Sequence, residues 1–255
     1  MLWKKSWWDT RWLFLAGLLA TLVMFGWALG WGHFDATRWT ARLQRMESMG
    51  ESERHALNNY QGHVWFLWFR LILNFIWADF AVALGAICLM SACPWTSYQK
   101  AAGLFAFSLP VSRRKVLLAP AAVGFIELFL IALIPSLLLP VIALFHGRRF
   151  SLGDALIYAL LLIFGGAVLF CFAFLLTVIF SNYIMAFVLM EIIIFALHLP
   201  FVSSASHPWW NILGVMAGES YFFHGQIPWF GLGISLILSA VFLFTAVRIY
   251  ERRDL

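Results

Sequence analysis

Long apolar stretches separated by polar segments dominate the hydropathy pattern of this chain. Six of them stand out, at about 12–31, 64–93, 116–145, 152–180, 183–199 and 228–247. A transmembrane helix needs about 20 mainly apolar residues, with about 17–25 as the usual range. The sequence lacks segments of about ten residues with alternating apolar and polar positions, which are typical of a membrane barrel. The pattern therefore predicts an all-α, polytopic membrane protein with six transmembrane helices in a single transmembrane domain, 1–255.

The second, third and fourth stretches are longer than a bilayer requires, and we expect these helices to tilt or to protrude. The third stretch also contains Pro120, Pro135 and Pro140. Proline removes a helical hydrogen bond and clashes with the preceding turn, so these positions predict bends or ends of helical segments.

Composition supports the same class of protein. The chain is 63% hydrophobic and 11% charged, whereas a soluble domain carries roughly 25% charged residues. It also contains 14 Trp and 26 Phe, and aromatic rings anchor helix ends at the membrane interface. A soluble globular fold would lack the polar residues needed to cover its surface.

The distribution of Lys and Arg predicts the orientation. With the N-terminus inside, ten basic residues lie in the cytoplasm and six lie outside. The inner ones are Lys4, Lys5, Arg11, Lys100, Arg113, Arg114, Lys115, Arg248, Arg252 and Arg253. This excess favours cytoplasmic N- and C-termini. The net charge of +5 is then explained by inner anchoring rather than by nucleic-acid binding.

The segment before the first stretch mixes aromatic and basic residues at near-helical spacing: Trp3, Trp7, Trp8, Arg11 and Trp12. This pattern predicts a short interfacial helix on the inner membrane face. The alternative is simple anchoring of the first span by an aromatic belt.

No motif for a metal ion or for catalysis stands out. Cys88, Cys93 and Cys171 lack C-x-x-C spacing and fall in or near apolar stretches, which favours buried thiols. His198, His207 and His224 match no metal-binding spacing either. We therefore predict no metal site and no catalytic residues.

Two outer segments have unusual patterns. The loop 33–63 contains a charged stretch, 36–49, with apolar residues at three- and four-residue spacing, which suggests an amphipathic surface helix. The region 201–227 is too apolar for a solvated loop and too broken for a span. We expect a broken or re-entrant helix there, with Glu219 facing protein or water.

The inner segment between the second and third spans, 96–115, is the most informative polar region. Thr96 is placed to cap a short helix that ends near Leu109, before a proline. Lys100, Leu104 and Phe107 lie on one face of that helix. A partly apolar helix of this kind suits docking into a groove on a soluble partner, and a plain connector with basic anchors is the alternative.

This region carries a family resemblance. The run 107–119, FSLPVSRRKVLLA, resembles the loop entering the third span of type-2 ATP-binding-cassette (ABC) exporter permeases, and the ending 249–255, IYERRDL, is similar to their cytoplasmic tail. Six spans, an amphipathic N-terminus and a broken segment before the last span fit the same family. The outer loop 33–63 is longer than in minimal members.

The resemblance implies a permease subunit that forms the transport path as a dimer, with an identical or related copy, in a prokaryotic plasma (inner) membrane. Two separate cytoplasmic ATPase subunits would bind ATP and magnesium, since this chain has no G-x-x-x-x-G-K-[ST] phosphate loop and needs no cofactor of its own. The segment Gln99–Leu109, with Gln99, Lys100, Leu104 and Phe107, would be the coupling helix that docks on the ATPase. Arg113, Arg114 and Lys115 would anchor the inner face.

Four charged residues fall inside the predicted spans: Arg70, Asp79, Glu127 and Glu191. Intramembrane charges are costly and often mark a transport pathway. Asp79 and Glu127 lie at a similar depth, about 18 Å from the inner end at about 1.5 Å per residue. One hypothesis is that they contact the substrate in a cavity between two subunits; the alternative is protonated carboxyls hydrogen-bonded within the bundle.

Other function classes stay open at this point. The chain could be a non-transporting membrane subunit that assembles or senses for a partner complex, and an intramembrane enzyme is the remaining class. The sequence leaves open the substrate, the choice of homodimer or heterodimer, and the role of the loop 33–63.

Overall fold

The structure is a computed structural model that describes residues 3–8, 10–23, 77–88, 112–145, 151–203, 212–216, 218, 221 and 226–252. The described residues form helices and their connections, without a strand. The labelled helices are α4 (Arg113–Phe145), α5 (Leu152–Phe180), α6 (Tyr183–Ser203), α7 (Ile212–Met216) and α9 (Trp229–Arg252). The segments Thr10–Val23 and Trp77–Ile87 are also helical and apolar. The prediction of an all-helical fold is confirmed for this part of the chain.

Three helices are long and apolar enough to cross a membrane. They are α5, α9 and the segment Arg114–Val141 of α4. They coincide with the third, fourth and sixth apolar stretches of the sequence. The first and second stretches extend beyond the described residues, so the count of six spans stays a prediction.

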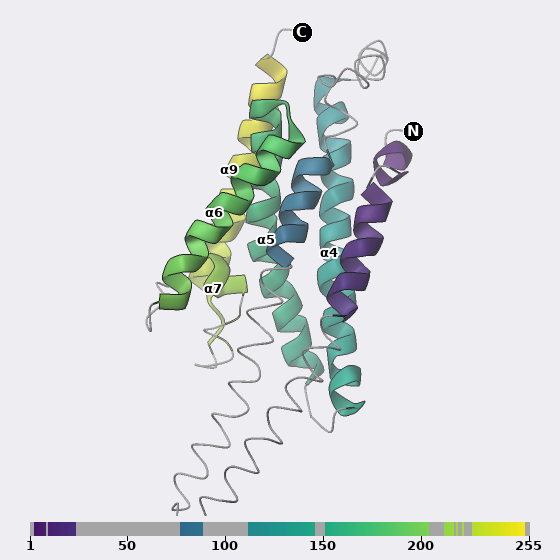
Figure 1. Cartoon of the computed structure of the whole chain (residues 1–255), viewed down its shortest axis with the longest axis vertical. Helices are drawn as coiled ribbons and strands as arrows, with labels where there is room; N and C mark the ends of the chain where they lie inside the picture. Colours follow the sequence, from purple (N-terminus) through teal and green to yellow (C-terminus); the bar gives the residue numbers. More distant parts are fainter. Residues whose placement is uncertain are drawn as a thin grey trace, which may run out of the picture.

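Helix α5 occupies the centre of the bundle, with α4, α6, α7 and α9 packed around it (Figure 1). Its mean hydropathy is the highest of the three long helices, and its buried residues point in all directions around the axis. A helix that is hydrophobic all round is one that buries all its faces. This explains why α5 shows almost no amphipathic pattern in the sequence.

Both ends of α5 are capped by side-chain or backbone contacts. At its start, the Ser151 hydroxyl accepts a hydrogen bond from the Asp154 amide at 3.0 Å. At its end, Ser181 adopts a left-handed conformation with φ of 55° and donates its amide to the Thr177 carbonyl at 2.9 Å. The next residue, Asn182, accepts from the Ile184 amide at 3.0 Å and so begins α6. The two helices are therefore joined by a turn of two capping residues.

Helix α4 corrects one expectation from the sequence. Pro120, Pro135 and Pro140 all lie inside a single helix of 33 residues, so of the two predicted effects, bends or ends, the end of a helical segment is wrong at all three positions and a bend stays a prediction. A proline removes one hydrogen bond, but neighbouring helices stabilise the interrupted turn when the helix is packed in a bundle. The apolar length of the segment prevails over the local preference of proline.

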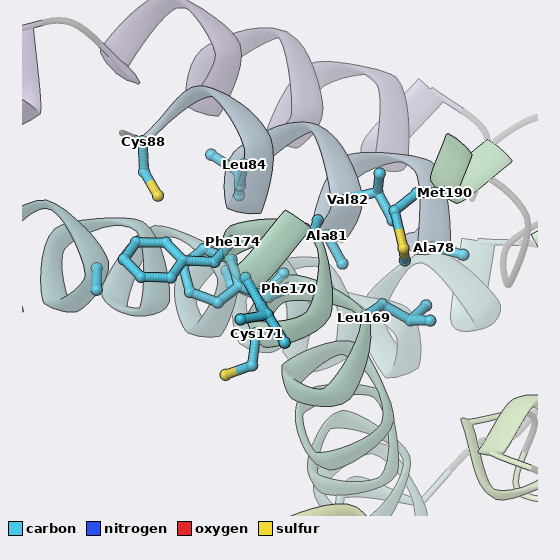
Figure 2. Packing of buried hydrophobic residues seen from close by; sticks show 14 of the residues in the cluster. Ala78, Ala81, Val82, Leu84, Cys88, Leu169, Phe170, Cys171, Phe174 and Met190 are labelled. Atoms are coloured by element: carbon cyan, nitrogen blue, oxygen red, sulfur yellow. The ribbon is translucent and has the colours of Figure 1, made fainter. Parts of the chain in front are cut away.

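Glycines bring the helices into close contact at the core. A Cβ atom on Gly85 would overlap the backbone carbonyl of Phe170, so Trp77–Ile87 and α5 touch backbone to backbone at this point. A Cβ on Gly124 would lie 2.9 Å from the Phe170 ring, which brings α4 to the same position. Figure 2 shows Phe170 and Phe174 of α5 among the buried side chains facing Ala81 and Leu84. Small residues at helix contacts are typical of membrane helix packing.

The N-terminal helix packs one face onto this core. Ser6, Thr10, Phe14, Gly17 and Thr21 are buried and recur every three or four residues, which defines a single helical face. Their burial follows the same stripe through both described segments, 3–8 and 10–23. Whether residues 3–8 lie on a membrane surface, as the sequence predicts, stays a prediction.

Candidate functional site

One ion pair lies at one end of the bundle, and one hydrogen bond lies at the other. The start of α4 and the end of α9 meet at one end through Arg114 and Glu251. At the opposite end, the Tyr221 hydroxyl donates to the Asp154 carboxylate at 2.8 Å, at the start of α5. The first residues of the N-terminal helix lie at the Arg114 end (Figure 1). This arrangement brings the start of the described chain and the end of α9 to the same end of the molecule.

The buried carboxyl of α4 is Glu127, whose exposed fraction is 0%. Its Oε1 atom lies 2.5 Å from the Thr10 hydroxyl, which is also 3.0 Å from the Ser6 carbonyl oxygen. The single Thr10 hydrogen cannot serve both acceptors at once. A proton on Glu127 would satisfy both contacts, because Glu127 would then donate to Thr10 and Thr10 to Ser6.

The second oxygen of this carboxyl, Oε2, finds no hydrogen-bond partner among the described residues. A buried oxygen without a partner costs about 1–3 kcal/mol. Thr10 is therefore the contact that holds Glu127, and it joins the N-terminal helix to α4.

Asp79 and Glu191 form a second carboxyl group contact. The two side chains lie close enough to interact, and this places a carboxyl group of Trp77–Ile87 beside one of α6. Both side chains are partly buried, and the Oε1 atom of Glu191 is buried without a partner among the described residues. The pair thus brings two carboxyl groups from different helices together.

The three acidic residues predicted to lie within spans are not grouped as their depths along the helices suggest. Asp79 contacts Glu191, and Glu127 contacts Thr10. Depth counted along separate helices says nothing about which helices are neighbours, and this is why sequence reasoning grouped Asp79 with Glu127. A role for these carboxyls in a transport pathway stays a prediction.

The inner anchors predicted from the sequence lie at the start of α4. The Nε atom of Arg114 donates to Glu251 Oε1, and its Nη2 atom lies 3.5 Å from Glu251 Oε2. Lys115 is exposed, and the helix includes Arg113 in its first turn. The guanidinium of Arg248 lies 5.0 Å from the centre of the Phe244 ring on α9. Glu251 was part of the tail that carries the family resemblance, but nothing in the sequence identified its partner.

Helix α7 lies against α5. The Met216 side chain occupies the position where a Cβ on Gly165 would stand. Gly165 is about 20 Å from the start of α5, which at 29 residues is about 44 Å long. Five residues after Met216, Tyr221 contacts Asp154 in the first turn of the same helix, and this hydrogen bond raises the pKa of the Tyr221 phenol above its ordinary value. Met216 therefore contacts the middle of α5, and Tyr221 contacts its start.

The aromatic and basic residues of the N-terminal helix contact one another. The Arg11 guanidinium lies 3.7 Å from the centre of the Trp8 ring and 5.2 Å from that of Trp12. Trp7 instead packs on Phe14, with ring centres 5.5 Å apart. Trp8 and Trp12 remain more than half exposed, at 51% and 69%.

Several predicted residues lie outside the described part of the chain. These are the coupling-helix residues Gln99, Lys100, Leu104 and Phe107, the intramembrane Arg70, the outer loop 33–63 and Glu219. Cys88 and Cys171 are buried, as predicted. Within the described ranges, no group of three or more His, Cys, Asp or Glu side chains is placed to hold a metal ion.

A scan against models of protein families and searches of curated proteins and of solved structures found no match for this chain.

Proposed function

We propose that this chain is the transmembrane permease subunit of an ATP-driven ABC exporter. It forms the translocation path as a dimer with an identical or related subunit, in a prokaryotic plasma membrane, with its N- and C-termini in the cytoplasm. Separate cytoplasmic ATPase subunits bind ATP and magnesium. The proposal starts from the family resemblance of residues 107–119 and 249–255, and the contact between two residues of these same regions supports it.

That contact is the ion pair between Arg114 and Glu251. Arg114 follows the proposed coupling helix, Gln99–Leu109, by five residues, and Glu251 lies in the last turn of α9. A force applied to the coupling helix by an ATPase would reach α4 first and α9 through this pair. The two stretches that carry the resemblance thereby act as one mechanical unit at the inner end.

The close packing around α5 supports a mechanism in which groups of helices move as rigid bodies. The backbone contact between Gly85 and Phe170 and the hydrogen bond from Trp77 Nε1 to the Leu162 carbonyl, at 2.9 Å, fix Trp77–Ile87 on α5. Packed cores switch between discrete arrangements more readily than they deform. Alternating access would then come from rigid-body movement of helix groups between subunits.

The broken outer region fits the same proposal. Met216 reaches about 20 Å along α5, and Tyr221 returns to its first turn. Irregular backbone at membrane depth requires burial in protein, and the contacts of Met216 and Tyr221 with α5 supply it. In the proposed topology, these two residues belong to the re-entrant element.

Association with an ATPase tests the proposal directly. The full-length chain, purified in mild detergent after co-expression with ABC ATPases encoded in the same genome, should retain one of them and be required for its coupled activity. Lys100→Glu should weaken capture because it reverses a charge in the coupling helix. Arg252→Glu is the matched control at the same end of the bundle, and it should leave capture intact.

Failure to retain any ATPase would favour the non-transporting subunit instead. The pathway role of the carboxyls has a separate test. Asp79→Asn combined with Glu127→Leu should reduce transport if these groups contact substrate. Unchanged transport by a normally folded double variant would assign both carboxyls to packing alone.

A further inference from the structure

The exposed side of the N-terminal helix carries three kinds of side chain in a fixed order. Lys4, Trp8, Trp12, Leu15 and Leu19 follow one another at three- or four-residue spacing and are all exposed. Residues at this spacing lie on the same face of a helix. The face therefore runs from a cation through two indole rings to branched aliphatic side chains.

A contact with helical spacing joins the two described parts of this segment. The Thr10 hydroxyl lies 3.0 Å from the Ser6 carbonyl oxygen four residues earlier, which is a contact made across one helical turn. The opposite face, through Ser6, Thr10 and Phe14, is buried against the bundle. The exposed face is consequently turned away from the protein core.

Arg11 adds a second cation to the same face, beside Trp8 and Trp12. Its guanidinium is held over the two rings, at 3.7 Å and 5.2 Å from their centres. Its Nε atom is buried without a hydrogen-bond acceptor among the described residues. The side chain as a whole is half-buried, and a guanidinium held in position on the exposed face is well suited to the oxygens of a phosphate group.

Charge favours an anionic occupant. Lys4, Lys5 and Arg11 stand against one carboxylate, Asp9, in the first 23 residues. Indole rings prefer the interfacial zone of a bilayer, between headgroups and acyl chains. Exposed Leu15, Leu19 and Val23 continue the face with 48%, 65% and 60% of their surface open.

We infer that this face binds one anionic phospholipid. Its phosphate lies at Lys4, Lys5 and Arg11, its glycerol region contacts Trp8 and Trp12, and an acyl chain runs along Leu15, Leu19 and Val23. The aliphatic part, from Leu15 to Val23, is about 12 Å long at about 1.5 Å per residue, which corresponds to the upper part of an acyl chain. The inference rests on the membrane location in the proposed function and not on the ATPase, so lipid binding and ATPase capture can succeed or fail independently.

Native mass spectrometry of the full-length protein tests the inference. The protein in mild detergent is incubated with equal amounts of phosphatidylglycerol and phosphatidylcholine that have identical acyl chains. We expect preferential retention of phosphatidylglycerol. Arg11→Gln should lower that preference about fivefold, because each basic residue near an anionic lipid surface contributes on the order of 1 kcal/mol, and the triple variant Lys4→Gln, Lys5→Gln, Arg11→Gln should abolish it.

Two controls distinguish binding at this site from non-specific attraction of lipids to the protein surface. Lys115→Gln removes an exposed cation at the same end of the bundle and should change the preference by less than Arg11→Gln does. Leu15→Ala with Leu19→Ala should reduce retention of both lipids without changing their ratio. The inference fails if the wild type retains the two lipids equally, or if the triple variant, with an unchanged thermal midpoint in lipid-free detergent, keeps the wild-type preference.

Discussion

Thr10 and Glu127 are 117 residues apart in the chain, and their side-chain oxygens lie 2.5 Å apart at the contact between the N-terminal helix and α4. Glu127 is completely buried, and this hydroxyl is the partner that the described structure provides for it. The contact therefore stabilises both the carboxyl and the position of the first helix.

Removing the hydroxyl should destabilise the protein. Thr10→Val keeps the shape of the side chain but leaves Glu127 without this partner, so we expect a loss of about 1–3 kcal/mol in the free energy of unfolding. Chemical unfolding in detergent measures it. Thr10→Ser retains the hydroxyl and should lose less; equal losses in the two variants would show that the hydrogen bond contributes nothing.

The backbone contact at Gly85 should not tolerate a methyl group. Gly85→Ala places a Cβ against the Phe170 carbonyl, and overpacking of this kind typically costs about 1–3 kcal/mol. Gly233→Ala on α9 is the matched control, because a Cβ there meets no atom within 4 Å. It should stabilise the helix by roughly 0.5–1 kcal/mol. Thermal midpoints that move in the same direction would contradict this account.

The ion pair between Arg114 and Glu251 should respond to charge reversal. Arg114→Glu and Glu251→Arg each place like charges together, so each should lower the thermal midpoint, and the double variant should recover much of the loss. Because both groups reach solvent, high salt should reduce the differences in thermal midpoint between the wild type and these variants. Lys115→Glu is the control for a charge change in the same turn. If the double variant is no better than the single ones, the pair does not hold α4 to α9.

The carboxyl pair should behave as a coupled unit. In a double-mutant cycle, Asp79→Ala and Glu191→Ala should show an interaction free energy of roughly 0.5–3 kcal/mol, as contacting residues do. The cycle that combines Asp79→Ala with Glu127→Ala should be additive within about 0.5 kcal/mol. Additivity in the first cycle would mean that the two carboxyl groups do not interact in solution.

Tyr221 predicts a dependence of stability on alkaline pH. Its hydrogen bond to Asp154 raises its pKa above the ordinary value of 10.0, so the folded state favours the neutral phenol. The stabilisation is complete below that ordinary value and is lost as the pH rises through the higher folded value. Tyr221→Phe should remove this part of the alkaline loss. The difference between the unfolding curves of the two proteins, measured from pH 8 to 11, should therefore shrink as the pH increases.

The sequence was most informative where apolar length alone decides the structure. The stretches 152–180 and 183–199 predict α5 and α6 within a few residues, because a long apolar run in a membrane can form little else than a helix. The three prolines of α4 do not end the helix, because packing outweighs their local preference. Local propensity is the weaker argument when a helix is packed on several sides.

Partners across the bundle could not be predicted. Nothing in the sequence around Glu127 identifies Thr10, and nothing around Asp79 identifies Glu191, because such contacts depend on which helices are neighbours and on how each is rotated. The ion pair of Arg114 with Glu251 is equally hidden in the sequence, although both residues belong to the stretches that carry the family resemblance. The order of the helices places Arg114 and Glu251 at the same end of the bundle, and helix packing brings their side chains into contact.

The two-residue turn at Ser181 and Asn182 has a consequence for how the chain tolerates insertions and deletions. Each residue caps one helix, so the turn has no slack. A length change of one residue must either unwind a cap or rotate α6 by about 100° about its axis. Such a rotation would carry Glu191 away from Asp79. The turn thus sets the rotation of α6 about its axis, and the contact between Glu191 and Asp79 depends on the exact number of residues in this connection.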